Sequence, residues 1–171
     1  MKAALLTRHG GNEALSVGSL PDPAPGPGEV RVRVLAAALN RLDVFVRNGI
    51  PGVPIEFPHV PGADACGRVE ALGAGVTGFA VGERVVLQPG LSCGSCEFCR
   101  AGETCLCVDF EILGEHRSGT LAERVVVPAA NVWKAPAHLT NEEAAAFPRA
   151  AMTAWRMLVT RAAVRPGESV L

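Results

Sequence analysis

Apolar and polar residues alternate in short stretches through most of the chain. The alternation is clearest at residues 29–34, where Val30, Val32 and Val34 share one face and two arginines take the other, as in a half-buried strand. Further short apolar stretches bounded by Gly or Pro predict strands at residues 2–6, 15–17, 68–72, 83–88, 121–127 and 131–134. Many short strands with little helix between them indicate a mainly β chain that folds as a closed or partly closed barrel.

Residues 41–47 interrupt this strand pattern. Their apolar positions predict a short helix, and Asn40 stands directly before it as a candidate N-cap. Proline-rich segments at residues 21–28 and 51–61 read as surface connections between strands.

The pattern changes to helical at Thr140. Thr140 and Glu143 have the spacing of a capping box, which predicts a helix that begins there. Pro148 is expected to break or kink that helix, and a second helical run is expected from residue 149 to about 161. Residues 165–171 predict a turn and the first residues of a strand, so we expect the chain to be a fragment of a longer protein.

Composition excludes several classes of protein. Hydrophobic residues make up 49% of the chain, which is typical of a globular protein and not of a disordered one. The net charge of −1 predicts neither a nucleic-acid nor a membrane partner. We see no signal peptide, and clustered cysteines without one favour a reducing, cytoplasmic location and a bound metal.

The most specific chemical pattern is the cysteine-rich segment CGSCEFCRAGETCLC at residues 93–107. Two residues separate Cys93 from Cys96 and Cys96 from Cys99, a spacing that suits three ligands of one zinc ion. Either Cys105 or Cys107 could be the fourth ligand, and disulfides are the alternative to a metal. Four thiolates leave no open coordination position, so the predicted zinc is structural. Cys66 lies far away in sequence and is expected to be a small buried residue.

Several segments together resemble the medium-chain dehydrogenase/reductase family, which includes the zinc alcohol dehydrogenases and the quinone oxidoreductases. These segments are GEVRVRV, ALNRLDVFVRNG, HVPGADACGRVEALGAGVTGFAVGERV, CGSCEFC, SGTLAERVVVP, EEAAAFPRAAMTAW and RPGESVL.

The resemblance implies a domain plan. It implies a GroES-like β-barrel at residues 1–139 with a zinc-binding lobe at 90–110, and it favours Cys107 as the fourth zinc ligand. Residues 140–164 would be a helical connection, and residues 165–171 would start a truncated Rossmann cofactor domain. The full-length parent would be mixed α/β, and a homodimer or homotetramer. It would bind NAD(P)H mainly through the missing domain.

The chain departs from the zinc alcohol dehydrogenases at the positions that hold their catalytic zinc. By the resemblance these positions are Asn40, Ala63 and Arg149, and none of them offers a thiolate or an imidazole. Leu42 stands where those enzymes carry a proton-relay hydroxyl. The resemblance therefore implies an oxidoreductase that reduces an enone, quinone or similar carbonyl acceptor by hydride transfer without catalytic zinc.

The same resemblance implies candidate site residues. Asn40 would donate a hydrogen bond to a substrate carbonyl, unless it only caps the helix after it. Asp43 and Asp64 match acidic positions that shape the active site. The candidates for cofactor binding are Arg41, Arg149 and Thr153. An ion pair with Asp43 or Asp64 is the expected environment of Arg149, because an unpaired buried arginine is costly.

Two other functions remain open at the level of sequence. The first is a zinc-dependent alcohol dehydrogenase with rearranged ligands recruited from Cys66, Asp64 or His59. The second is a stand-alone zinc-stabilised barrel that acts as a binding module. The four histidines are isolated in sequence and are expected to be surface or packing residues; only His59 lies near the loop that would form the cleft.

Overall fold

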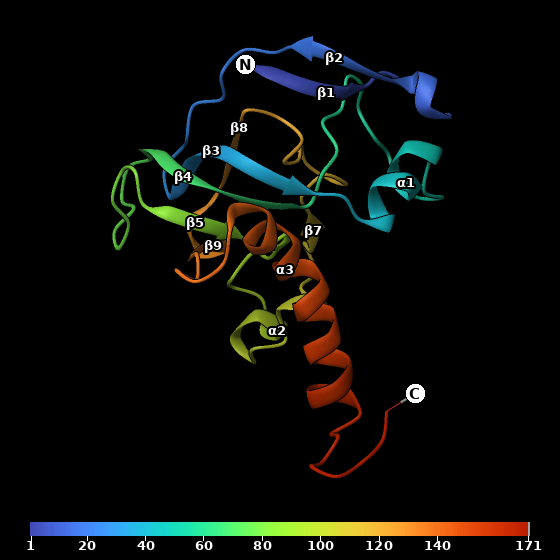
Figure 1. Ribbon diagram of the computed structural model, residues 1–171, viewed down its shortest axis with the longest axis vertical. Helices are drawn as coiled ribbons and strands as arrows, with labels where there is room; N and C mark the ends of the chain where they lie inside the picture. The colour runs from blue at the N-terminus through green and yellow to red at the C-terminus, as the bar shows by residue number, and fades with distance from the viewer. Residues whose placement is uncertain (171) are drawn as a thin grey trace.

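The protein is mainly β, with three α-helices set around the strands (Figure 1). The structure, a computed structural model, describes residues 1–170. The strands are β1 Lys2–Leu6, β2 Leu15–Ser19, β3 Glu29–Ala38, β4 Asp64–Leu72, β5 Arg84–Leu87, β6 Gly90–Leu91, β7 Glu111–Ile112, β8 Arg124–Pro128 and β9 Val132–Lys134. The helices are α1 Arg41–Asn48, α2 Glu97–Arg100 and α3 Asn141–Trp155, with a π-helical turn at Arg156–Arg161 and 3-10 turns at Asn12–Ala14, Thr104–Leu106 and Ala129–Asn131.

The main sheet has five antiparallel strands in the order β8-β3-β4-β5-β9. Register shifts along β3, at Arg31/Val32 and Val34/Ala36, mark irregularities of the kind that bend a strand and increase its twist. The β1–β2 hairpin joins the rest of the molecule through single bridges from Ala3 to Ala122 and from Leu6 to His59. The result is a curled, partly closed barrel, which confirms the fold class expected from the sequence (Figure 1).

The alternation along β3 places its valines in the core. Val30 and Val32 are fully buried and pack with Val69, Val85 and Leu87 from the neighbouring strands. The arginines between them, Arg31 and Arg33, lie on the opposite face, as a period of two requires. Burial of one face therefore sets the register of this strand.

Arg84 on β5 fixes the start of α3 against the sheet. Its guanidinium donates to Asn141 Oδ1 at 2.9 Å and to the carbonyl oxygens of Pro136, Leu139 and Thr140 at 3.1, 2.8 and 2.7 Å. The capping box expected at Thr140 is present, with the Thr140 hydroxyl accepting from the Glu143 amide at 3.2 Å. Strand β5 and helix α3 are thus joined at a defined point.

Of the two outcomes expected at Pro148, a break or a kink, the break is wrong, because α3 runs without interruption from Asn141 to Trp155. A proline inside a helix removes one N–H donor and crowds the preceding turn. Here Pro148 is buried, and the next amide, that of Arg149, donates to Asp64 Oδ1 of β4 at 3.2 Å. Packing of α3 on β3 and β4 therefore holds the helix together across the proline.

The last residues do not contain the expected strand within the described range. Pro166 and Gly167 form a turn, but residues 168–170 are not in a strand, and Leu171 lies outside the described residues. None of the helices found in residues 1–170 has both the length and the hydrophobicity that a bilayer crossing needs.

Candidate functional site

Four cysteines converge in the lobe that follows β6. The sulfur atoms of Cys93, Cys96, Cys99 and Cys107 all lie within 4.8 Å of one another, and the Sγ atoms of Cys93 and Cys99 are 4.0 Å apart. Tetrahedral zinc with bonds of about 2.3 Å needs sulfurs about 3.8 Å apart. The short helix α2 carries Cys99, and the loop after it returns Cys107 to the same point. The four thiols therefore fit one zinc ion.

The thiols of this cluster differ in pKa, because backbone amides and neighbouring thiols surround each of them differently. Hydrogen bonds from the backbone at Ser95 and Cys96 lower the pKa of Cys93 to about 6. Burial, followed by the neighbouring thiols of Cys96 and Cys107, raises the pKa of Cys99 to about 11. Hydrogen bonds from the backbone at Cys99 and Val108 also lower the pKa of Cys96. A divalent ion would stabilise the thiolates that these amides favour.

Cys105 is not part of the cluster. It is exposed, and its thiol faces Glu103 Oε2 at 4.0 Å. Cys107 is buried, and its sulfur accepts the amide of Cys93 at 3.3 Å. All six cysteines are free in the structure, so the arrangement is that of a thiolate site and not of disulfides.

A second polar cluster lies where α1, β4 and α3 meet. The side chain of Asn40 donates from Nδ2 to Asp64 Oδ2 at 2.9 Å. The backbone amide of Asn40 donates to Asp43 Oδ2 at 2.6 Å. The Arg149 amide donates to the other oxygen of Asp64, Oδ1, at 3.2 Å. The structure therefore brings together Asn40, Asp43, Asp64 and Arg149, which the sequence places far apart.

Two groups that support this cluster were not identified from the sequence. The Gly62 amide donates to Asp43 Oδ1 at 3.0 Å, and the Thr120 hydroxyl donates to the carbonyl oxygen of Asp64 at 3.0 Å. Thr120 and Asp64 are 56 residues apart in the chain, and no motif links them. Only the folded structure reveals these contacts.

Asp64 is the most perturbed acid of this cluster. It is fully buried, and burial raises the pKa of its carboxyl to about 6. The hydrogen bonds from the Asn40 side chain and the Arg149 amide oppose this rise, because they stabilise the carboxylate. Asp64 therefore holds or releases a proton close to neutral pH at a site that also contains an amide donor.

The other predicted residues lie as follows. The ion pair expected for Arg149 is not formed: Arg149 meets Asp64 through its backbone amide, and its guanidinium is in none of the ion pairs found among residues 1–170. The group that reaches the carboxylate is the Arg149 backbone amide, which follows Pro148 in α3. Arg41 is exposed and lies over the ring of Phe45 at 5.8 Å. Thr153 is exposed on α3, one turn beyond Arg149.

The ligands suggested for a rearranged catalytic zinc are not assembled. Within residues 1–170, the four-cysteine lobe is the only group of three or more Cys, His, Asp or Glu side chains close enough to share an ion. The thiol of Cys66 is directed at Asn141 Oδ1 at 3.8 Å, and His59 Nε2 is 2.9 Å from the carbonyl oxygen of Gly114. His59 is therefore a buried packing residue.

The raised pKa of Asp64 predicts a specific pH dependence of stability. The folded state binds the Asp64 proton more tightly than the unfolded state, whose pKa is near 3.8, so this group's contribution declines as pH rises through 6. We expect the unfolding free energy of the wild type, minus that of Asp64→Asn, to fall by about 2 kcal/mol between pH 4 and pH 7. Urea unfolding at each pH measures it. A difference that stays constant would contradict the prediction.

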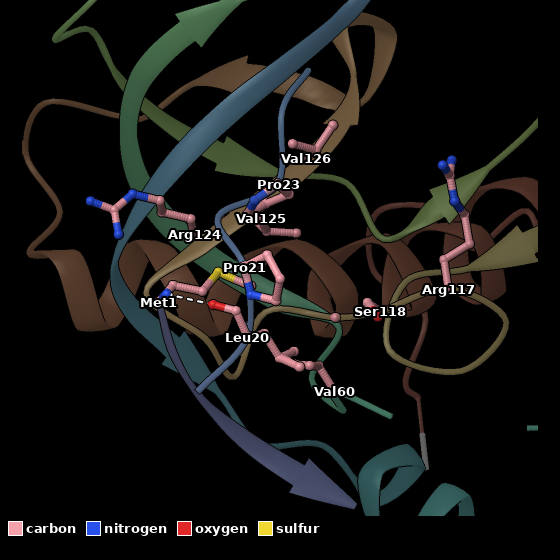
Figure 2. A pocket seen from close by; sticks show the side chains of 11 residues that line it. Met1, Leu20, Pro21, Pro23, Val60, Arg117, Ser118, Arg124, Val125 and Val126 are labelled. Carbon is pink, nitrogen blue, oxygen red and sulfur yellow. Dashed lines mark hydrogen bonds between the residues drawn. The ribbon is translucent and has the colours of Figure 1, made fainter. Parts of the chain in front are cut away.

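Figure 2 shows a cavity of about 310 Å³ beneath the N-terminus, lined by Val60 and by residues of the 20–23 and 117–126 segments. Its charged groups are already paired. The amino group of Met1 donates to the Leu20 carbonyl at 2.7 Å and pairs with Asp22 at 3.0 Å, and Arg124 pairs with Glu70 at 2.9 Å. This cavity offers packing and no chemistry.

A larger apolar groove of about 710 Å³ runs between α3 and the β5–β9 edge of the sheet. Its walls carry the exposed aromatic side chains of Trp133, Phe147 and Trp155. The groove borders Pro148, and none of its lining residues belongs to the Asn40–Asp64 cluster.

The chain matches a known domain family and several dehydrogenases. Residues 26–137 match the alcohol dehydrogenase GroES-like domain. The L-threonine 3-dehydrogenase of Pyrococcus horikoshii is 37% identical over 124 residues, which are 71% of this chain and 36% of that protein. The starvation-sensing protein RspB of Escherichia coli K12 is 38% identical over 122 residues, with the same coverage of 71% and 36%.

Solved structures of alcohol dehydrogenases are also similar to this chain. An NAD-dependent alcohol dehydrogenase superposes with a TM-score of 0.94 at 56% identity, over 98% of this chain and 49% of that one. A thermostable alcohol dehydrogenase from Pyrobaculum aerophilum, with cobalt and zinc bound, superposes with a TM-score of 0.88 at 40% identity, over 99% and 50%. The chain spans about a third of the length of the curated relatives and about half of the solved ones. Because the matched domain covers more than half of the chain, the chain belongs to the medium-chain dehydrogenase/reductase family and carries its GroES-like domain.

Proposed function

We propose that this chain is the substrate-binding half of an NAD(P)-dependent oxidoreductase. Its hydride acceptor is an enone, a quinone or a similar carbonyl compound, and its cleft works without a catalytic zinc. Residues 165–171 lead into the domain that binds the nicotinamide cofactor. The extent of the match supports this plan, because the chain spans about half of the solved dehydrogenases that it resembles.

One observation supports the absence of catalytic zinc most directly. The positions that resemble the zinc-ligand positions of alcohol dehydrogenases are Asn40, Ala63 and Arg149. In the structure, Asn40 and Arg149 meet on the carboxylate of Asp64, while Ala63 is buried in an apolar cluster. An amide, a methyl group and a backbone N–H offer no ligand that zinc prefers.

The side-chain amide of Asn40 is suited to polarise a substrate carbonyl. It has two N–H donors, and one of them is used by Asp64 Oδ2 at 2.9 Å. The second donor is left for a substrate oxygen, and Asp64 holds the amide in place. The nicotinamide cofactor would supply the hydride. The Asn40 side chain would stabilise the negative charge that develops on the acceptor oxygen.

The structural zinc is a second element of the proposal. Cys93, Cys96, Cys99 and Cys107 would hold one ion in a closed shell, which stabilises the lobe and leaves no open position for substrate.

A zinc-dependent alcohol dehydrogenase is the second candidate function. Its support is the likeness to alcohol dehydrogenases, one of them with cobalt and zinc bound. It would need a ligand set other than Cys66, Asp64 and His59 as they stand, since these are not grouped in the described residues. A stand-alone binding module is the third, and it predicts no turnover by the complete gene product.

The test is turnover by the complete gene product. We expect oxidation of NADH or NADPH in the presence of an enone or quinone, with no gain in rate on adding zinc. Asn40→Ala should lower kcat for the acceptor by about 10²- to 10³-fold, the usual effect of removing one such donor. Steady-state kinetics over a panel of enones, quinones, aldehydes and alcohols measures both effects.

Asn48→Ala is the matched control, because Asn48 is exposed at the end of α1 and should leave the rate unchanged. Alcohol oxidation that rises with added zinc would favour the alcohol dehydrogenase. Failure to turn over any member of the panel would reject the proposal.

A further inference from the structure

Asp64 holds the Asn40 side chain from the buried side of the cluster. Asp64 is fully buried at the start of β4, whereas Asn40 is only half-buried, directly before α1. A substrate can therefore touch the Asn40 side chain but not the Asp64 carboxylate. A contribution of Asp64 to the proposed reaction would pass through the side chain that it holds.

Each oxygen of the Asp64 carboxylate accepts one hydrogen bond. Oδ2 accepts from Asn40 Nδ2 at 2.9 Å, and Oδ1 accepts from the backbone amide of Arg149 at 3.2 Å. A side-chain NH2 group and a backbone N–H are both donors only. The arrangement therefore fits an ionised Asp64, which only accepts.

A proton on Asp64 breaks this match. A protonated carboxyl carries an O–H donor, and neither of the two partner atoms can accept it. A buried donor without an acceptor is costly, and the backbone amide of Arg149 cannot turn. The Asn40 side chain can turn, because half a rotation of its last torsion exchanges Nδ2 for Oδ1, which accepts the O–H.

This rotation changes what a substrate meets. Ionised Asp64 uses one N–H of Asn40 Nδ2 and leaves the second for a substrate oxygen. In the rotated amide, Oδ1 takes the place of Nδ2, and its lone pairs repel a substrate oxygen. The proton on Asp64 thus replaces a donor by an acceptor at the same point.

We infer that Asp64 is a positioning residue whose proton decides whether Nδ2 or Oδ1 of Asn40 faces the substrate. Ionised Asp64 holds Nδ2 in the donor position, and protonated Asp64 brings Oδ1 there instead. The catalytic consequence rests on the proposed function, in which the Asn40 side chain stabilises charge on the acceptor oxygen. The acceptor is thus reduced fastest when Asp64 is ionised.

The surroundings of Asp64 set the pH at which this change occurs. Burial raises the pKa of Asp64 to about 6. Two charged groups face it and act in opposite directions, since Asp43 of α1 raises the pKa and Arg149 of α3 lowers it. The adjoining β3 and the segment before β8 contribute Ala38 and Thr120, which carry no charge. Because the ionised form is the active one, kcat should fall as the pH falls through the pKa of Asp64.

An NMR titration of the complete gene product, labelled with ¹⁵N-asparagine, tests the switch without requiring turnover. The side-chain NH2 signals of Asn40, identified by their loss in Asn40→Ala, should shift with one midpoint at a pH of about 6. In Asp64→Asn that midpoint should disappear. Asn48, exposed at the end of α1, is the internal reference, and its signals should stay constant.

The pH dependence of kcat, measured with the best acceptor of the enone and quinone panel, tests the catalytic consequence. In the wild type, kcat should fall about 10-fold per pH unit below the pKa of Asp64. Asp64→Asn keeps the size of the side chain and cannot ionise. Its oxygen should stay with the Arg149 amide, so its NH2 group faces Asn40 and rotates that side chain as a proton does. The kcat of this variant should be about 10²-fold lower than that of the wild type at about pH 8, and independent of pH.

Asp109→Asn is the matched control, because Asp109 is exposed in the turn before β7 and lies outside the cluster. It should keep both the rate and the pH dependence of the wild type. A merely structural role of Asp64 would lower the rate of Asp64→Asn but leave the fall of kcat at low pH in place.

Asn40 signals that titrate with Asp64, together with a fall of kcat that Asp64→Asn removes, would support the inference. Constant Asn40 signals in the wild type would overturn it, even if Asp64→Asn fails to fold. The same shift in Asp64→Asn, or a fall of kcat that persists in that variant, would overturn it as well. If the Asn40 signals titrate with Asp64 but no acceptor of the panel is reduced, the switch is supported and the proposed function is rejected.

Discussion

Cys107→Ser should cause the loss of bound zinc and a large loss of stability. Cys107 is the buried member of the four-cysteine lobe, and its sulfur, which accepts the Cys93 amide, closes the loop back onto Cys93. A serine hydroxyl is a poor zinc ligand at neutral pH, and three remaining thiolates would repel one another with a weakly held ion. We expect zinc content to fall from one per chain to near zero after dialysis against a chelator. The unfolding free energy should fall by about 4 kcal/mol or more, as for other losses of a structural metal.

Cys105→Ser is a close control for this experiment. Cys105 lies two residues away in the same loop, but it is exposed and outside the cluster, so both zinc content and stability should match the wild type. Elemental analysis and urea unfolding measure the two quantities. Equal zinc loss in both variants would mean that the ion is not held by the four clustered sulfurs. Two zinc ions in the wild type would point to a second metal site and favour the alcohol dehydrogenase.

Gly119→Ala should destabilise the protein by about 3 kcal/mol or more. A Cβ atom at this position would lie 2.1 Å from the carbonyl oxygen of Gly62 and 2.7 Å from both Gly114 Cα and the Pro61 carbonyl oxygen. All three are backbone atoms, so no side-chain rotation can relieve the overlap. The displaced Gly62 carries the amide that binds Asp43, so the substitution should also disturb the Asn40–Asp64 cluster.

Gly75→Ala separates crowding from backbone strain. Gly75 has a φ of +79°, and a Cβ atom added there would have no heavy atom within 4 Å. Alanine at this position therefore meets only the strain of a left-handed conformation, about 1–2 kcal/mol. Thermal or urea unfolding of both variants measures the difference. A smaller loss for Gly119→Ala than for Gly75→Ala would show that segments 61–62 and 114–119 are not packed as described.

Local patterns predicted most of the elements correctly. The alternation in β3, the helix start at Asn40 and the capping box at Thr140 act over a few residues, and the structure contains each of them. The spacing of Cys93, Cys96 and Cys99 is also local, and the structure brings these three sulfurs together. The choice between Cys105 and Cys107 needed either the family resemblance or the structure, because the spacing alone allows both.

The sequence by itself therefore determined the strand and helix pattern, the caps and the cysteine lobe, because each depends on neighbours along the chain. The tertiary structure decided the rest. Pro148 stays inside α3 because β4 gives the Arg149 amide a partner, and Asp64 titrates near 6 because β4 is buried under α3. A polar pocket of about 340 Å³ forms between residues 54–59 and residues 115–118. Such contacts depend on which distant segments pack together, and burial then sets the charge and proton affinity of the groups between them.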